Sequence, residues 1–174
     1  MRRTATLLFV AAALSFAQVH VKRASLEATE KTADQRLIRV VESPFALLGP
    51  TRAMYVDGYG VVFSAELNLF PGPTLNPFHQ SITKEDIARV RARKLERLPA
   101  LRQSMRDIIL SAAASLDEVP AVERIVVGVT LLHLSYEDIS GMPAQIVMQG
   151  QRGRLVEAKL GRVPPDSVIK TQEF

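Results

Sequence analysis

A stripe of apolar residues between positions 87 and 116 constrains the fold of this chain more than any other feature. The stripe consists of Ile87, Val90, Leu98, Leu101, Met105, Ile108, Ala112 and Leu116. These residues recur at steps of three and four positions, or their sums, which return to the same side of a helix. The spacing therefore predicts a long helix with one buried side, capped at its start by Thr83. Pro99 predicts either a kink in this helix or a break into two abutting helices.

Asp57-Gly58 lies between two runs of alternating character, 51–56 and 59–69, and predicts a β-hairpin. Asp-Gly suits a type I′ turn, whose two central residues both need a positive φ. The second run places four apolar side chains on one face, namely Phe63, Ala65, Leu67 and Leu69. Such alternation is typical of a strand with one buried face.

Shorter patterns predict the remaining elements and, with them, the fold class. Residues 25–42 predict an N-terminal helix capped by Ser25, and residues 125–134 a central strand covered on both faces or along most of its length. Residues 144–149 predict a shorter strand, and residues 154–160 one or two helical turns. This order favours an α+β domain in two layers, with about four strands in an antiparallel or mixed sheet packed by the one long helix.

The domain boundaries follow from the same patterns. We expect a helical segment over residues 18–43, a single α+β domain over residues 44–162, and a polar, loosely attached tail over residues 163–174. Residues 1–17 have the pattern of a secretory signal peptide. Arg2 and Arg3 give a basic start, and the apolar run that follows is too short to span a bilayer.

The signal pattern predicts an exported protein, periplasmic or secreted. Ser15 and Ala17 are small residues at positions −3 and −1 of a cut before Gln18. Cleavage after Ala17 would leave a soluble mature chain without a membrane-spanning segment. A buried N-terminal helix is the alternative interpretation of this stretch.

Composition excludes several classes of site. The chain has no cysteine, so it forms no disulfide, thiol nucleophile, cysteine zinc site or acylated lipoprotein anchor. Its formal net charge is +4, and Arg2 and Arg3 carry two of these charges. The small excess that remains argues against nucleic acid as a partner. No P-loop, dinucleotide fingerprint or nucleophile elbow occurs, so we expect no cofactor.

Histidine and carboxylate residues give the candidates for catalysis. His133 lies near the end of the predicted central strand, and Glu137 and Asp138 follow four and five positions later. A histidine with two carboxylates can form an acid–base pair or ligate a metal. Strand-to-loop spacing does not force the three side chains together, so a structural histidine is the alternative. Asp57 is a further candidate, although the hairpin turn alone explains an aspartate there.

Two segments are candidates for binding. The loop over residues 70–81 is the longest connection of the predicted domain and carries Phe78 and His79 as candidate contacts. The long helix carries a basic cluster, of which Arg91, Arg97, Arg102 and Arg106 are the candidates for binding polyanions. These charges spread around the helix and alternate with carboxylates, so a solvated surface is the alternative.

The runs TRAMYVDGYGVVFSAELNL and SITKEDIARVRARKLERLPALRQSMRDIILSAAASLD carry a resemblance to known proteins. The chain resembles a group of small exported bacterial proteins of uncharacterised function over roughly residues 44–149. The resemblance implies export and a single domain, and it implies no activity, cofactor or binding residue.

Three hypotheses for function remain. The preferred one is an exported, soluble, non-enzymatic binding or accessory domain of the bacterial envelope, whose partner is an unknown envelope protein or polymer. The second is a hydrolase or metal-dependent enzyme that uses His133, Glu137 and Asp138. The third is a polyanion-binding protein that uses the arginine-rich helix.

Overall fold

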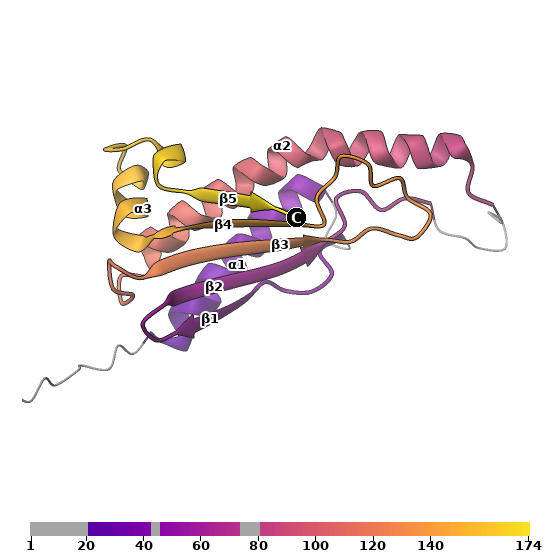
Figure 1. Cartoon of the computed structure of the whole chain (residues 1–174). Coiled ribbons are helices and arrows are strands. Elements are labelled where there is room, and N and C mark those ends of the chain that lie inside the picture. The colour runs from indigo at the N-terminus through magenta and orange to yellow at the C-terminus, as the bar shows by residue number, and fades with distance from the viewer. Residues whose placement is uncertain (1–20, 43–45, 74–80) are drawn as a thin grey trace, which may run out of the picture.

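The computed structural model describes residues 21–42, 46–73 and 81–174, and the predicted signal peptide lies outside these ranges. Three helices and a sheet of five strands make up the described part (Figure 1). The elements in chain order are α1 (Arg23–Val41), β1 (Arg52–Val56), β2 (Gly60–Leu67), α2 (Lys84–Ser115), β3 (Arg124–Leu131), β4 (Gln145–Gln151), α3 (Arg152–Lys159), a 3₁₀ turn (Pro165–Ser167) and β5 (Lys170–Glu173). The predicted α+β class is confirmed.

The strands are ordered β1-β2-β3-β4-β5 across the sheet, as in the chain. β2 and β3 run parallel, with α2 as the connection between them, and the other three pairs are antiparallel. A parallel pair needs a crossover of a dozen residues or more, which a long helix supplies. The sheet is therefore mixed, and β3 is its central strand.

The hairpin of β1 and β2 is present, but its turn is not of type I′. Val56 pairs with Gly60, so three residues connect the strands where two were predicted. Gly58 has a φ of 72°, whereas Asp57 is not among the residues of positive φ. The amide of Tyr59 donates to the carbonyl of Val56 at 3.0 Å. A type I′ turn needs positive φ at both central residues, so the predicted turn type is wrong.

α2 is one continuous helix that passes through Pro99. Thr83 caps it as predicted, through a reciprocal capping box with Asp86. The ribbon of α2 changes direction along its length in Figure 1. A proline inside a helix removes one backbone hydrogen bond and bends the axis, and here the packed apolar stripe on either side keeps the helix intact.

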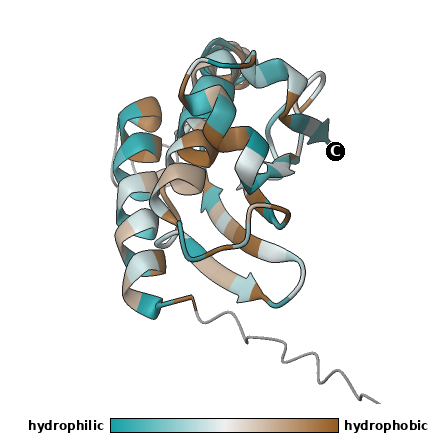
Figure 2. Cartoon of the chain, turned by 90° about the vertical axis from the view of Figure 1, so that its left-hand side faces the viewer, coloured by the Kyte–Doolittle hydropathy of each residue, from teal (hydrophilic) through white to brown (hydrophobic). Residues whose placement is uncertain are grey.

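The core lies between the helices and one face of the sheet. Phe63 of β2, Val127 of β3 and Met148 of β4 are all buried on this face, opposite the stripe of α2. α1 covers the β1 side and α3 packs against α2 and β4. All three helices lie on the same side of the sheet (Figures 1 and 2). The central strand is buried along most of its length, which is one of the two predicted alternatives. Cover of both faces throughout is wrong, because Val126 is buried on the second face but Thr130 is exposed there.

Two predicted boundaries also differ from the structure. α1 begins at Arg23 with Lys22 as its N-cap, so Ser25 lies inside the helix. The tail predicted over residues 163–174 contains β5, which pairs with β4 and adds a fifth strand. Ile169, directly before this strand, is buried, which ties the segment to the core. Among the described helices, none combines the length and apolar character needed to cross a bilayer.

Candidate functional site

Two of the predicted catalytic residues, His133 and Glu137, come together around a third residue, Lys94 of α2. The Lys94 ammonium lies 2.5 Å from Oε2 of Glu137 and donates to the carbonyl of Leu132 at 2.9 Å. Nδ1 of His133 lies 3.6 Å from the same carboxylate oxygen. The side chains of Lys94, Glu137 and His133 are 0%, 1% and 13% exposed. The cluster is thus sealed inside the protein.

Burial and the ion pair have opposite effects on the pKa of Lys94 in this cluster. Desolvation lowers the pKa of Lys94, and the hydrogen bond and charge of Glu137 oppose that shift. His133 Nε2 lies 3.2 Å from the carbonyl of Pro143, while His133 Nδ1 and Glu137 Oε1 have no hydrogen-bond partner. The cluster fastens the loop over residues 132–144 to α2, and its carboxylate is 1% exposed.

Asp138 and Asp57, the other two catalytic candidates, lie elsewhere. Asp138 is on the surface, where it pairs with Arg91 at 3.3 Å and accepts from the Ser140 amide. Hydrogen bonds from the side chain and from the backbone amide of Ser140 lower the pKa of Asp138, and the charge of Arg91 adds to this shift. Asp57 lies in the β1–β2 turn, at the opposite end of the strands from His133. β2 spans the distance between those ends, and the seven steps between its eight residues amount to roughly 23 Å.

Asp57 and the buried Glu123 flank the phenol of Tyr55 at that opposite end. The phenol oxygen lies 3.2 Å from Glu123 Oε1 and 3.3 Å from Asp57 Oδ1. Desolvation and the charge of Glu123 raise the pKa of Tyr55 to about 12. The Tyr55 phenol thus connects Asp57 of the β1–β2 turn with Glu123. These three residues are not part of the His133 cluster.

The arginines of α2 that were predicted to bind polyanions are each paired with a carboxylate of this chain. Their partners are Asp138 for Arg91, Glu42 for Arg97, Glu173 for Arg102 and Asp166 for Arg106. Arg97 also donates to the carbonyls of Val41 and Leu69 and lies 5.3 Å from the ring centroid of Phe70. These arginines tie α2 to surrounding segments, so their charge is largely neutralised.

The loop candidates Phe78 and His79 lie outside the described residues. The described start of their loop borders a hollow of about 420 Å³ between Phe70–Pro73 and the first turns of α2. Tyr136 reaches this segment, because its hydroxyl donates to the carbonyl of Pro73 at 2.9 Å. Burial and the charges of Glu137 and Asp86 raise the pKa of Tyr136.

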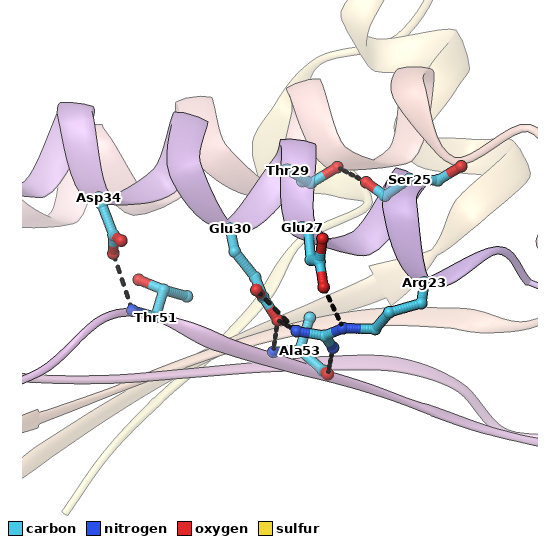
Figure 3. A network of polar contacts seen from close by, with 8 residues as sticks. All are labelled: Arg23, Ser25, Glu27, Thr29, Glu30, Asp34, Thr51 and Ala53. Carbon is cyan, nitrogen blue, oxygen red and sulfur yellow. Dashed lines mark hydrogen bonds and ion pairs between the residues drawn. The ribbon is translucent and has the colours of Figure 1, made fainter.

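The outer edge of β1 is occupied by side chains of α1 (Figure 3). Glu30 accepts from the amide of Ala53 at 2.7 Å, and Asp34 accepts from the amide of Thr51 at 2.8 Å. Arg23 donates to the carbonyl of Ala53 and holds both oxygens of Glu30. Residues four apart on a helix rise about 6 Å and residues two apart on a strand about 6.7 Å, so the two spacings match. α1 therefore satisfies the backbone groups that a neighbouring strand would otherwise satisfy.

The second face of the sheet is left uncovered by the helices, and we call it the open face. The open face presents Arg52, Met54, Val62, Ser64, Glu66, Arg124, Gly128, Thr130, Gln145, Val147, Gln149, Gln151, Lys170 and Gln172. Amide side chains and cations predominate on β4 and β5, and Glu66 of β2 is the acidic residue on these strands that points to this side.

A hollow of about 240 Å³ lies on the open face, where β3, β4 and the start of β5 are adjacent. It is lined by Arg124, Gln149, Gly150, Gln151, Val168 and Lys170. Arg124 donates to the amide oxygen of Gln149 at 2.9 Å, and the Gln149 amide donates to Gln172 at 3.2 Å. The hollow thus holds two cations and two primary amides.

Sequence reasoning found part of this arrangement. It named His133 and Glu137 as joint candidates without establishing that their side chains meet, and it missed both Lys94 as their partner and the open face. A lysine within an apolar helical stripe was the available signal, because Lys94 lies four positions after Val90 and four before Leu98. In the described part of the chain, no three histidine, cysteine, aspartate or glutamate residues are grouped so that they could hold a metal ion.

Comparison with known proteins does not assign the chain to a family. Neither a family model, nor a curated protein, nor a solved structure matches this chain. The geometry of the described residues therefore carries the functional argument.

Proposed function

We propose that this chain is an exported binding or accessory domain of the bacterial envelope, and that it binds through the open face of its sheet. The observation that carries the proposal is a group of three cations on the open face without a carboxylate partner. The arginines of α2 meet carboxylates of the chain, whereas Arg52, Arg124 and Lys170 on the open face have none among their described contacts. Positive charge that is displayed and not neutralised is available to a partner.

The burial of the His133 cluster argues against the enzymatic alternative. A general acid or base must come within hydrogen-bond reach of its substrate, about 2.6–3.2 Å. Lys94 and Glu137 are sealed from solvent, and Asp138 and Asp57 lie away from them. The cluster instead does a structural task, since it fastens a loop of thirteen or so residues to α2 by a buried ion pair.

The alternative of polyanion binding by α2 is weakened by its ion pairs. Binding a polyanion there would require Arg102 to leave Glu173, to which it donates at 2.7 and 2.8 Å. That hydrogen bond and the charge of Glu173 raise the pKa of Arg102, and Arg102 lowers the pKa of Glu173. Replacing the Glu173 carboxylate by an anionic group of a polymer would therefore add little binding free energy.

Cell fractionation with intact-mass measurement tests the export half of the proposal. We expect the full chain, expressed in a Gram-negative host, to appear in the periplasm or medium with Gln18 as its first residue. A Leu8→Asp variant interrupts the apolar run of the signal and should stay in the cytosol at full length, because export requires that run. A wild-type protein that keeps Met1 or Arg2 and remains in the cytosol would contradict the proposal.

A further inference from the structure

The hollow beside Arg124 on the open face combines charge with pre-arranged geometry. It is shallow, about 240 Å³, and its polar lining comes from Arg124, Gln149, Gln151 and Lys170. Gly150 faces the helical side, where a Cβ would lie 2.6 Å from the carbonyl oxygen of Val168 and 2.9 Å from Leu155 Cδ2, so β4 adds only backbone at this position. The floor is backbone of β4, and the cations stand on the strands on either side.

A neutral residue holds the Arg124 guanidinium in place. The Gln149 amide oxygen accepts from Arg124 Nη1, and the Gln149 amide nitrogen donates to Gln172. The neutral Gln149 amide orients the guanidinium and leaves its positive charge in place. An aspartate or glutamate partner would neutralise that charge. Pre-orientation removes part of the entropy cost that a long side chain pays on binding.

Carboxylates are kept away from this hollow. Glu123 precedes Arg124 in the chain, but its carboxylate is buried on the helical side of the sheet and meets Tyr55 there. Glu66, the acidic residue of the open face, lies on β2 and lines a different hollow with Arg52. An anion that enters the Arg124 hollow therefore meets two cations and no competing acidic side chain from its lining.

The side chains around the two cations indicate which uncharged groups the ligand carries. Each primary amide offers donors and an acceptor in one plane, and these match the hydroxyl groups of a sugar. Gln145, Gln149, Gln151 and Gln172 supply four such groups on β4 and β5. Aromatic rings, on which bases of a nucleic acid would stack, are absent from the lining of this hollow.

The open face offers an extended ligand a further cation, Arg52, beyond the Arg124 hollow. Arg52 is on β1, at the far side of the open face from Lys170 on β5, and four strand spacings amount to about 19 Å. A ligand that reaches both cations must extend across the sheet and carry repeated negative charge. It also crosses the row of small residues formed by Ser64 of β2 and Gly128 of β3, which pair with each other.

We propose that the open face binds an acidic polysaccharide, with an anionic group of the polymer held between Arg124 and Lys170. The proposal deepens the proposed function by naming the class of envelope partner. Recognition is reversible and involves no covalent step. The anionic group is a carboxylate or a sulfate, which share the same charge-assisted hydrogen bonds with guanidinium and ammonium groups.

Binding of defined polymers to the full chain, measured by isothermal titration calorimetry at low and high salt, tests this inference. The probes are alginate for carboxylate, dextran sulfate for sulfate, poly-L-glutamate for an acidic polypeptide, and uncharged dextran. We expect at least one acidic polysaccharide to bind wild type and uncharged dextran not to bind. Affinity should fall steeply as salt rises, because the contacts are ionic and exposed.

Two double variants with the same net charge distinguish specific binding at the hollow from a general effect of the protein's positive charge. Arg124→Gln with Lys170→Gln should weaken binding at least tenfold. Lys31→Gln with Arg39→Gln removes the same charge from exposed positions of α1 on the helical side, and it should stay within twofold of wild type. Gln149→Ala leaves the charge unchanged but releases Arg124, and it should weaken binding several-fold. Circular dichroism and melting curves verify that each variant is folded.

Three results would overturn the inference. They are no binding of either acidic polysaccharide by wild type at low salt, equal losses in the two charge-matched variants, and binding of poly-L-glutamate alone. These outcomes are distinguishable from failure of the proposed function. A protein that is exported and retained in the envelope, yet binds no acidic polysaccharide, contradicts only this inference. A protein that binds alginate but stays in the cytosol contradicts only the proposed export.

Discussion

Lys94 and Glu137 depend on each other at the scale of single residues. Taking either charge out of water is costly, and their mutual attraction at 2.5 Å offsets that cost only while both are present. The carbonyl of Leu132 satisfies a further proton of Lys94. The pair therefore specifies where the loop over residues 132–144 docks on α2, more than it adds to overall stability.

We predict that Lys94→Met destabilises the protein by about 3–5 kcal/mol, because Glu137 is then buried without a partner. The double variant Lys94→Met with Glu137→Leu should recover much of this loss, since an apolar pair of similar volume often replaces a buried ion pair at little cost. Urea unfolding of wild type, both single variants and the double variant measures the coupling. A double variant whose loss equals the sum of the single losses would show that the two residues act independently.

At the scale of elements, α1 serves as a cover for the edge of the sheet. An unpaired strand edge invites addition of a strand from another molecule, and proteins protect such edges in several ways. Here Glu30 and Asp34 accept the outward amides of Ala53 and Thr51, and Arg23 donates to the outward carbonyl of Ala53 (Figure 3). The helix imitates the hydrogen bonds of a neighbouring strand with its side chains.

Glu30→Ala should cost about 2–3 kcal/mol, because it leaves a buried amide of β1 without an acceptor and removes a charged partner of Arg23. Glu27→Ala is the matched control, since Glu27 pairs with the same arginine but is half exposed. It should change stability by less than about 1 kcal/mol. Amide hydrogen exchange should show lost protection at Ala53 in the first variant only. Equal exchange of this amide in both variants would mean that Glu30 does not cap the edge.

Local patterns predicted most of the elements, and long-range pairings account for what was missed. The hairpin and α2 follow from the alternation of residues 59–69 and the stripe of residues 87–116, which are signals carried by neighbouring positions. β5 escaped prediction because Lys-Thr-Gln-Glu has no apolar alternation, and its strand character comes from pairing with β4. The three-residue turn depends on the register of Val56 with Gly60, which the Asp-Gly dipeptide does not specify.

The same contrast holds for the candidate site. His133 and Glu137 were named together as candidates because they are four positions apart, but the spacing from strand to loop did not establish that their side chains meet. Lys94 was missed as their partner because 43 positions separate it from Glu137. The arginines of α2 were predicted as a polyanion surface, since their carboxylate partners are also distant, 71 positions for Arg102 and Glu173. Which charges remain free was therefore decided by the tertiary fold.

At the scale of the whole molecule, the fold is a two-layer domain whose helices cover one side of a five-stranded sheet (Figures 1 and 2). One side packs against the core, and its helices carry most of the ion pairs between elements. The other displays cations, amides and half-buried valines. This division places the surface available to a partner on the open face, and our account of an exported binding domain depends on it.

Site-specific photocrosslinking in intact cells tests that division most directly. A photoreactive amino acid replaces Ser64, an exposed residue on the open face, or Ala92, an exposed residue of α2 on the helical side. Both are small and carry no described polar contact, so neither exchange should disturb the fold. We predict that envelope material is captured from position 64 and not from position 92. Capture from position 92 alone would contradict the account.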